Sequence, residues 1–294
     1  MVELYEAGNQ SARPNKISYV SLINAITRSG DPDKAERAEK VLFQMYKQYQ
    51  DGHNDLKPTA KTIAMVLDAW QKSGKPDAGE RAEALLDWML GLYKEAMDKR
   101  LEPNEYIYSS VISAWSKSHC FGKAPRARRV LEKMRKMHDS GAISAAPNTH
   151  CYTGVINSCA YCLDDELEKK DALKIALATY KESERTSEHG RPNHVTYATM
   201  LAALNNLLDP SPERTAAMGS IFKRCCITGQ VDSMVLRRLE TSLSPSELQE
   251  VLCTEDLVTP EGEIKRGALP VDWQSNLRLR STGSLKASLD GIAA

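Results

Sequence analysis

Apolar and polar residues recur along this chain with helical spacing, and the whole pattern returns every 44 or 45 residues. Each return begins at a proline: Pro14, Pro58, Pro103, Pro147 and Pro192. Five residues after the proline stands a tyrosine, or once an isoleucine, and an apolar pair follows, as in Leu22 and Ile23. Apolar residues three and four positions apart line one face of a helix. The sequence therefore predicts a repeat protein whose units open with an amphipathic helix.

A second apolar stripe follows the first in each of the early units. The two are separated by polar breaks such as Ser-Gly-Asp-Pro at 29–32 and Ser-Gly-Lys-Pro at 73–76. The second stripe has the sequences RAEKVLFQM, RAEALLDWM and RARRVLEKM, which end at Met45, Met89 and Met134. Glycine after one helix and proline at the start of the next are typical of a helical hairpin. Each unit is predicted to be a helix, a turn and a second helix.

Hairpins repeated in tandem predict an all-α fold, a right-handed α-α superhelix or solenoid with a C-terminal helical cap. Residues 1–13 are expected to be the tail of a truncated preceding repeat, with any targeting segment upstream. The expected repeats are 14–57, 58–102, 103–146, 147–191 and a degenerate fifth at 192–240, followed by a capping helix at 241–253. Residues 254–294 are expected to be a partly disordered tail in which Trp273 anchors against the cap.

The degenerate end of the array keeps a helical pattern. One predicted face comprises Met218, Ile221, Phe222 and Cys225, and another comprises Val231, Met234, Val235 and Leu239. Ser244 is expected to cap a short helix that has Pro245 in its first turn.

The composition limits the classes of function that this chain can have. Lys plus Arg equals Asp plus Glu at 39 each, so no global field attracts nucleic acid, and any positive surface must be local. No apolar run approaches the length that crosses a bilayer. Seven cysteines, an odd number without regular spacing, favour a reducing compartment over a disulfide scaffold.

Candidate chemistry is sparse. Cys159 and Cys162 occupy ordinary first-helix positions, which favours core packing over a zinc site. The acidic run of Asp164, Asp165, Glu166 and Glu168 lies where a solvated turn is expected rather than a magnesium site. We expect no catalytic residues, no metal, no cofactor and no enzymatic activity.

These units resemble those of pentatricopeptide repeat proteins, in their PNxxxY-xx-VI-xAW first helices and methionine-ended second helices. The resemblance covers residues 1 to about 240, and the unit is about ten residues longer than the usual one. This elongated form is similar to the one found in algal and diatom organellar proteins. The resemblance implies a monomer that binds single-stranded organellar RNA, with a processing or translation factor as a further partner, in a mitochondrion or chloroplast.

The resemblance also implies which side chains meet RNA, about one base per unit. Bases would be recognised by the residue after the tyrosine and by the residue after the next proline. The first set is Val20, Ala64, Ser109, Thr153 and Ala198, and the second is Thr59, Asn104, Asn148 and Asn193. Ser109 with Asn148 and Thr153 with Asn193 match adenine-recognising pairs. The residues of the second set are also good helix N-caps, and capping alone explains them equally well.

Two further sets complete the implied RNA surface. Residues two before the tyrosine would stack on bases: Ile17, Lys61, Tyr106, His150 and Val195. Arg28, Lys72 and Lys117 recur near the ends of the first helices and would contact phosphates. A favourable interaction with the helix dipole is the other explanation for these three cations.

Two other functions remain open at this point. A tetratricopeptide-like scaffold would bind a peptide in its groove through carboxylate clamps or apolar pockets. An RNA-processing enzyme would have a nuclease domain outside this sequence.

Overall fold

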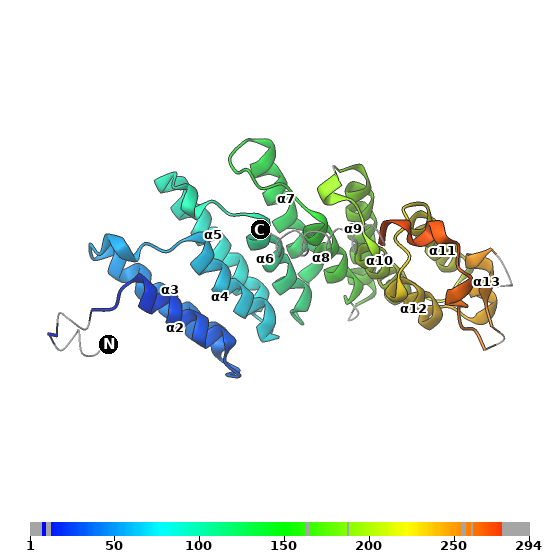
Figure 1. The fold of residues 1–294 in the computed structure, drawn as a ribbon, viewed down its shortest axis with the longest axis horizontal. Coiled ribbons are helices and arrows are strands. Elements are labelled where there is room, and N and C mark those ends of the chain that lie inside the picture. Colours follow the sequence, from blue (N-terminus) through cyan, green and yellow to red (C-terminus); the bar gives the residue numbers. More distant parts are fainter. Residues whose placement is uncertain are drawn as a thin grey trace, which may run out of the picture. The chain divides into compact units, whose positions relative to one another are not determined.

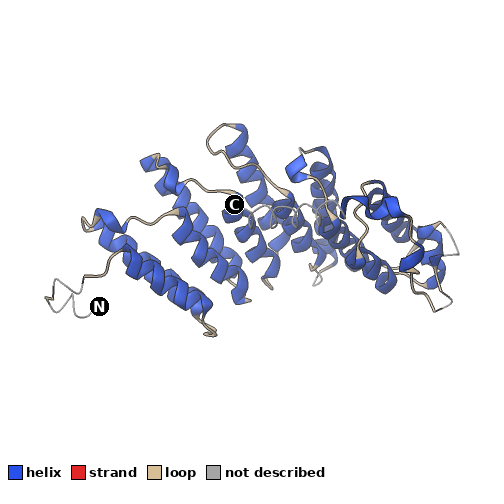
Figure 2. Cartoon of the chain, in the orientation of Figure 1, coloured by secondary structure: helices blue, strands red, loops and turns tan. Residues whose placement is uncertain are grey.

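The computed structural model describes residues 8–9, 13–162, 165–186, 188–253, 257–259 and 261–277. Within these ranges the chain forms α-helices joined by loops and short 3-10 turns, and its only extended pairing is the isolated bridge between Val258 and Ile264 (Figure 2). The chain divides into two compact units, Met1–Pro147 and Asn148–Ala294. The prediction of an all-helical protein is confirmed. No helix in the described part has the length and apolar character needed to cross a bilayer.

The first unit contains three helical hairpins (Figure 1). Their leading helices are α2 (Lys16–Arg28), α4 (Ala60–Ser73) and α6 (Glu105–Lys117), and their trailing helices are α3 (Lys34–Gln50), α5 (Ala78–Ala96) and α7 (Lys123–Asp139). Each leading helix packs against its own trailing helix. Helix α4 also packs against both α2 and α6. Consecutive leading helices of this unit are therefore neighbours.

The second unit contains two longer hairpins and a smaller one. Its helices are α8 (Thr149–Ala160), α9 (Glu166–Arg185), α10 (His194–Leu207), α11 (Pro212–Ile227), α12 (Ser233–Ser242) and α13 (Pro245–Leu252). Helix α10 packs against α8, α9, α11 and α12. The residues of the two predicted apolar faces are buried except for Met234, which is 46% exposed. Leu236, which was not predicted to lie on either face, is buried.

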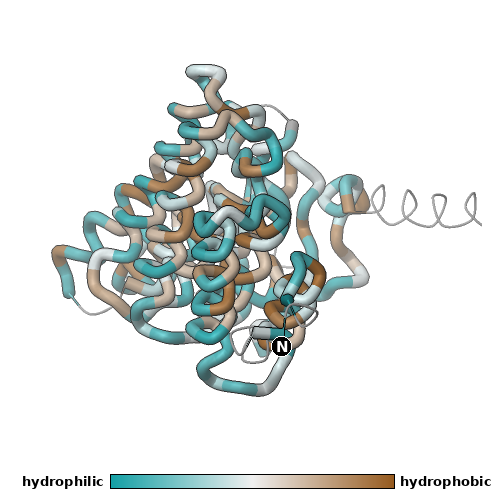
Figure 3. Tube along the Cα trace, turned by 90° about the vertical axis from the view of Figure 1, so that its left-hand side faces the viewer, coloured by the Kyte–Doolittle hydropathy of each residue, from teal (hydrophilic) through white to brown (hydrophobic). Residues whose placement is uncertain are grey.

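The helical stripe forms the core of each hairpin. The repeated tyrosines and apolar pairs are mostly buried, and Trp70 and Trp115 are 1% exposed. Figure 3 shows polar and apolar residues alternating along the helices, as expected for elements with one buried face.

A repeated contact between three side chains joins consecutive hairpins of the first unit. Trp70 on α4 donates its indole Nε1–H to Glu39 on α3 at 2.7 Å. Arg81 on α5 pairs with the same carboxylate and lies over the Trp70 ring, with 5.8 Å between Cζ and the ring centroid. Burial raises the pKa of Glu39, while the charge of Arg81 and the indole hydrogen bond oppose that rise.

The next junction repeats two of these contacts, but its arginine, Arg126, pairs with Glu80 instead of with the carboxylate that accepts from the tryptophan. Trp115 on α6 donates to Glu83 on α5 at 2.9 Å, and Arg126 on α7 lies over the Trp115 ring at 5.1 Å. The equivalent positions one repeat later hold Arg128 and Cys159. The recurring Arg-Ala-Glu sequence therefore connects one hairpin to the next. In the following repeat, where the tryptophan is absent, the glutamate that would accept its hydrogen bond is absent too.

Close packing of α5 on α6 gives a stability prediction. A Cβ added at Gly79 would lie 2.4 Å from the Trp115 ring, whereas nothing lies within 4 Å of a Cβ added at Gly91 on the same helix. Gly79→Ala is expected to destabilise the first unit by about 1–3 kcal/mol through overpacking. Gly91→Ala is expected to stabilise it by about 0.5–1 kcal/mol, because alanine favours a helix interior. Urea unfolding of the two variants measures the contrast, and equal effects would contradict this packing.

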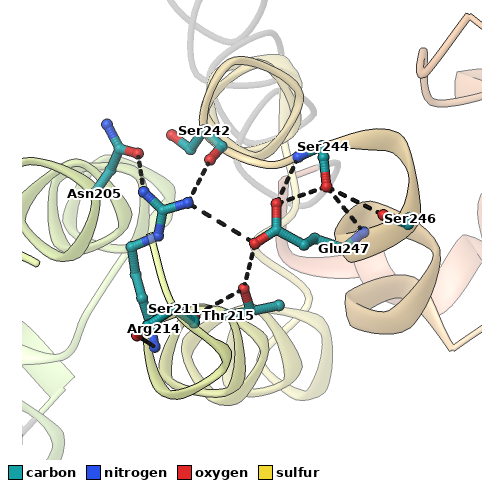
Figure 4. Close-up of polar contacts among 8 residues, drawn as sticks. All are labelled: Asn205, Ser211, Arg214, Thr215, Ser242, Ser244, Ser246 and Glu247. Atoms are coloured by element: carbon teal, nitrogen blue, oxygen red, sulfur yellow. Dashed lines mark hydrogen bonds and ion pairs between the residues drawn. The ribbon is translucent and has the colours of Figure 1, made fainter. Parts of the chain in front are cut away.

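A buried arginine joins four helices of the second unit (Figure 4). Arg214 on α11 is 6% exposed and donates to Asn205 Oδ1 and to the Ser242 carbonyl, each at 3.3 Å. Its Nη2 lies 3.9 Å from Glu247 Oε1 on α13. Glu247 also accepts hydrogen bonds from the Ser244 backbone N–H at 2.8 Å and from the Thr215 hydroxyl at 2.7 Å. The predicted cap at Ser244 is confirmed as a full capping box.

These hydrogen bonds make part of the second unit's stability dependent on pH. Chiefly the Ser244 backbone N–H, and then the Ser244 and Thr215 hydroxyls, lower the pKa of Glu247 from its ordinary 4.5 to about 2. The stabilisation is present above pH 4.5 and is lost as the pH falls toward 2. Glu247→Gln is expected to cost about 1–2 kcal/mol at pH 6 and little near pH 2.

Denaturant unfolding at the two pH values tests this prediction. Glu250→Gln makes the same change at an exposed position of α13 and serves as the control. A difference between Glu247→Gln and wild type that does not shrink with acidification would contradict the assignment.

Candidate nucleic-acid interface

The leading helices of the first unit each present one partly exposed stripe of four positions. The positions are three, six, ten and fourteen residues after the unit's proline, so they lie on one helix face. They are Ile17, Val20, Asn24 and Arg28 on α2, Lys61, Ala64, Asp68 and Lys72 on α4, and Tyr106, Ser109, Ser113 and Lys117 on α6. We call these twelve residues the leading-helix surface. All of them are exposed or half-buried.

A hydrogen-bond network joins two helices across this surface. Tyr106 on α6 donates its hydroxyl to Asp68 Oδ1 on α4 at 3.2 Å. Lys72 donates to Asp68 Oδ2 and Gln71 donates to Asp68 Oδ1, each at 2.7 Å. Asp68 thus holds an expected stacking ring and an expected phosphate-binding cation next to each other.

The charges of this network fit its geometry. Burial alone would raise the pKa of Asp68, but the hydrogen bonds from Lys72, Gln71 and Tyr106 outweigh it and lower that pKa. The hydrogen bond to Asp68 raises the pKa of Lys72. Burial, followed by the charge of Asp68, raises the pKa of Tyr106. At neutral pH the network therefore consists of a carboxylate, an ammonium group and a neutral phenol.

The leading-helix surface is positively charged although the whole chain is neutral. Its cations are Arg28, Lys61, Lys72 and Lys117, and its one carboxylate is Asp68. On the same surface, Tyr106 is 49% exposed and Ile17 is 74% exposed. Cations beside an accessible ring are the groups that bind a single-stranded nucleic acid backbone and its bases.

The residues that follow each proline begin the leading helices. Asn15, Asn104, Asn148 and Asn193 accept a backbone N–H at the third helical position through their side-chain oxygens. Thr59 stands at the N-cap of α4, where its hydroxyl lies 3.2 Å from the Thr62 hydroxyl. Capping engages the amide oxygen of each asparagine, and the NH₂ group is the part of the side chain that capping leaves available to another partner.

The candidate positions of the second unit have different surroundings. Thr153 shares a 2.7 Å hydrogen bond with Thr196, which in turn bonds to Asn193 at 3.1 Å. The structure therefore brings the expected pair of Thr153 and Asn193 together through Thr196.

The Ser109 hydroxyl, in the first unit, donates to the Tyr106 carbonyl at 3.1 Å.

Ala198 requires a correction. It is 2% exposed, on a helix that packs against α12, and so has no surface to offer a base. Val195 on the same helix is half-buried, whereas His150 on α8 is exposed. Among the candidate positions of the second unit, His150 on α8 is thus the exposed one.

The sequence did not single out Asp68 as part of the candidate site. The sequence contained a signal that could have predicted it: Asp68 stands four residues before Lys72, a spacing that favours an ion pair on one helix face. The hydrogen bond from Tyr106 depends on how α4 and α6 pack and has no counterpart in either helix alone.

The residues considered for metal binding serve structural roles. Cys159 and Cys162 are buried, and the Cys162 thiol donates to the Ser158 carbonyl. Asp165 caps α9 and Glu166 pairs with Lys169, while Asp164 lies outside the described residues. The described part of the chain contains no group of three or more side chains placed to hold a metal ion.

Comparisons with known proteins add no family assignment. No protein-family model matches the chain, and no curated protein matches it. The resemblance to pentatricopeptide repeat proteins therefore depends on the repeated residues themselves.

Proposed function

We propose that this chain binds single-stranded RNA on its leading helices, as a right-handed α-α solenoid of the pentatricopeptide type. It acts without catalysis of its own in the stabilisation, processing or translation of organellar transcripts. The observation that carries this proposal is the network of Lys72, Asp68 and Tyr106, which places a cation beside an exposed aromatic ring between neighbouring helices.

The positive charge of the leading-helix surface supports RNA over a basic peptide as the guest. Four cations and one carboxylate suit a phosphate backbone, whereas a clamp for a peptide's cationic groups would require recurring carboxylates. The spacing of Arg28, Lys72 and Lys117, once per hairpin, suits a guest whose charges also repeat.

The experiment is selection of a randomised single-stranded RNA pool by this chain at two salt concentrations, with duplex RNA and single-stranded DNA as controls. Enrichment of single-stranded RNA, with an affinity that falls as salt rises, is expected. No enrichment and no salt dependence would overturn the proposal in favour of a peptide-binding scaffold.

Removing the charge of Asp68 is expected to strengthen RNA binding by the same surface. Asp68→Asn removes the carboxylate that neutralises Lys72 and repels phosphate, while the amide can still accept a hydrogen bond from Tyr106. RNA affinity is expected to rise about 5-fold, because a negative charge that repels the phosphate backbone is removed while Lys72 keeps its phosphate contact. Fluorescence anisotropy with a labelled RNA measures the change.

The control for Asp68→Asn is Asp87→Asn. Asp87 on α5 forms an equivalent exposed pair with Lys133 on α7, away from the leading helices. This variant is expected to bind RNA as the wild type does. An equal rise in both variants would mean that only the net charge matters.

A further inference from the structure

The second unit contains a cavity of about 740 Å³ between α11, the end of α13 and the 3-10 turn Val271–Gln274. A cavity of this size can hold a small molecule. Its apolar lining includes Phe222, Val251 and Trp273, and also Ile227, whose side chain is 68% exposed. The cavity therefore suits a ligand whose body is apolar.

Close contacts hold the walls of the cavity. A Cβ added at Gly219 on α11 would lie 3.5 Å from the Val251 side chain on α13, so the two helices are in near contact there. The Trp273 ring meets the Phe222 ring edge-on, with 5.4 Å between centroids and an interplanar angle of 89°. Val231 donates its backbone N–H to the Trp273 carbonyl at 2.9 Å, which fixes the 3-10 turn. The described residues therefore form the cavity before any ligand binds.

The charged groups of the lining are mostly negative. Glu250 on α13 and Asp272 in the 3-10 turn are exposed carboxylates, and Lys223 on α11 is the cation of the lining. Within the described part of the chain, none of these three side chains has an ion-pair partner. Two unpaired carboxylates and one ammonium group leave the cavity with a net negative charge, which attracts a cation.

Two helix C-termini add to this negative potential. Helices α11 and α13 end at Ile227 and Leu252, and residues from the last turn of each line the cavity. The C-terminal end of a helix carries a partial negative charge, because its last carbonyl groups have no N–H partners within the helix. Trp273 also supplies an aromatic ring, whose face attracts a cation. These features together favour a positively charged head group.

We propose that this cavity binds a small hydrophobic amine, with its apolar body against Phe222, Val251 and Trp273 and its ammonium group at Glu250 and Asp272. A hydrophobic carboxylate is disfavoured, because it would meet two like charges and two negative helix ends. The proposal does not depend on RNA binding, since the cavity belongs to the second unit and the leading-helix surface to the first.

Calorimetric titration of the full chain with three probes of equal chain length tests the class of ligand. The probes are decylamine, decanol and decanoate, each kept below the concentration at which it forms micelles. Decylamine is expected to bind about 10-fold more tightly than decanoate, with decanol between them. Equal affinities, tighter binding of decanoate, or no binding of decylamine would overturn the proposal.

Thiol labelling tests where the amine binds. Cys253 lines the cavity and is exposed, whereas burial raises the pKa of Cys226, the other cysteine of the lining, to about 12 and keeps its thiol unreactive. Near-saturating decylamine is expected to slow alkylation of Cys253 by iodoacetamide about 5-fold. Cys120 of the first unit is the internal control and should react at an unchanged rate. Unchanged labelling of Cys253, or equal slowing at both cysteines, would contradict binding in this cavity.

A paired substitution tests the role of the carboxylates. Glu250→Gln with Asp272→Asn removes both charges and leaves the apolar walls in place. This variant is expected to lose the preference for decylamine over decanoate and to bind decanol as the wild type does. The matched control is Glu261→Gln with Glu263→Gln, which removes two exposed carboxylates of the same unit that lie outside the lining. A preference retained in the first variant, or lost equally in both, would also overturn the proposal.

Discussion

Trp115→Ala is expected to lower the free energy of unfolding of the first unit by about 3–5 kcal/mol, the largest effect of any single change considered. The side chain is 1% exposed, packs against Gly79 and donates to Glu83. Alanine leaves a cavity between α5 and α6, removes the surface beneath Arg126 and leaves Glu83 without its indole donor. Equilibrium urea unfolding, followed by circular dichroism, measures the loss.

Trp115→Phe is the matched control for this experiment. Phenylalanine retains most of the ring and loses the 2.9 Å hydrogen bond to Glu83, so a smaller cost of about 1–2 kcal/mol is expected. A cost below about 1 kcal/mol for alanine would contradict the central place of this tryptophan between the hairpins.

The triple variant Arg28→Ala, Lys72→Ala and Lys117→Ala is expected to weaken binding of single-stranded RNA about 100-fold at 0.1 M salt. The same variant should reduce the slope of log affinity against log salt by about 2, because three phosphate contacts are lost. All three side chains lie at the exposed ends of leading helices. Filter binding across a salt series gives both quantities.

A second triple variant separates phosphate contact from the helix dipole. Lys47, Lys94 and Lys136 are last-turn cations of the trailing helices α3, α5 and α7. Changing these three to alanine removes equal charge and equal dipole stabilisation and is expected to leave the salt slope close to that of wild type. Equal losses in both triple variants would mean that the leading helices are not the RNA surface.

Local signals in the sequence predicted the helices and their starts. The asparagines at 104, 148 and 193 cap the helices they precede, and Ser244 with Glu247 forms a capping box, because capping depends only on residues a few positions apart. Spacing likewise predicted the buried tyrosines. These features needed no knowledge of the neighbouring hairpins.

Contacts between hairpins could not be predicted in the same way. Glu39, Trp70 and Arg81 meet from three helices, so their association depends on how those helices pack. Ala198 matched the repeat pattern but lies buried on α10, against which α12 packs. The sequence predicted an apolar stripe on α12 but not which helix it would contact.

The most direct test of the central claim is crosslinking of a 4-thiouridine-containing single-stranded RNA to this chain, with the modified peptides identified by mass spectrometry. We expect crosslinks on α4 and α6, in the peptides that contain Lys61, Lys72 and Tyr106, and we expect high salt to reduce them. Crosslinks confined to the trailing helices α3, α5 and α7, or none at low salt, would contradict RNA binding by the leading-helix surface.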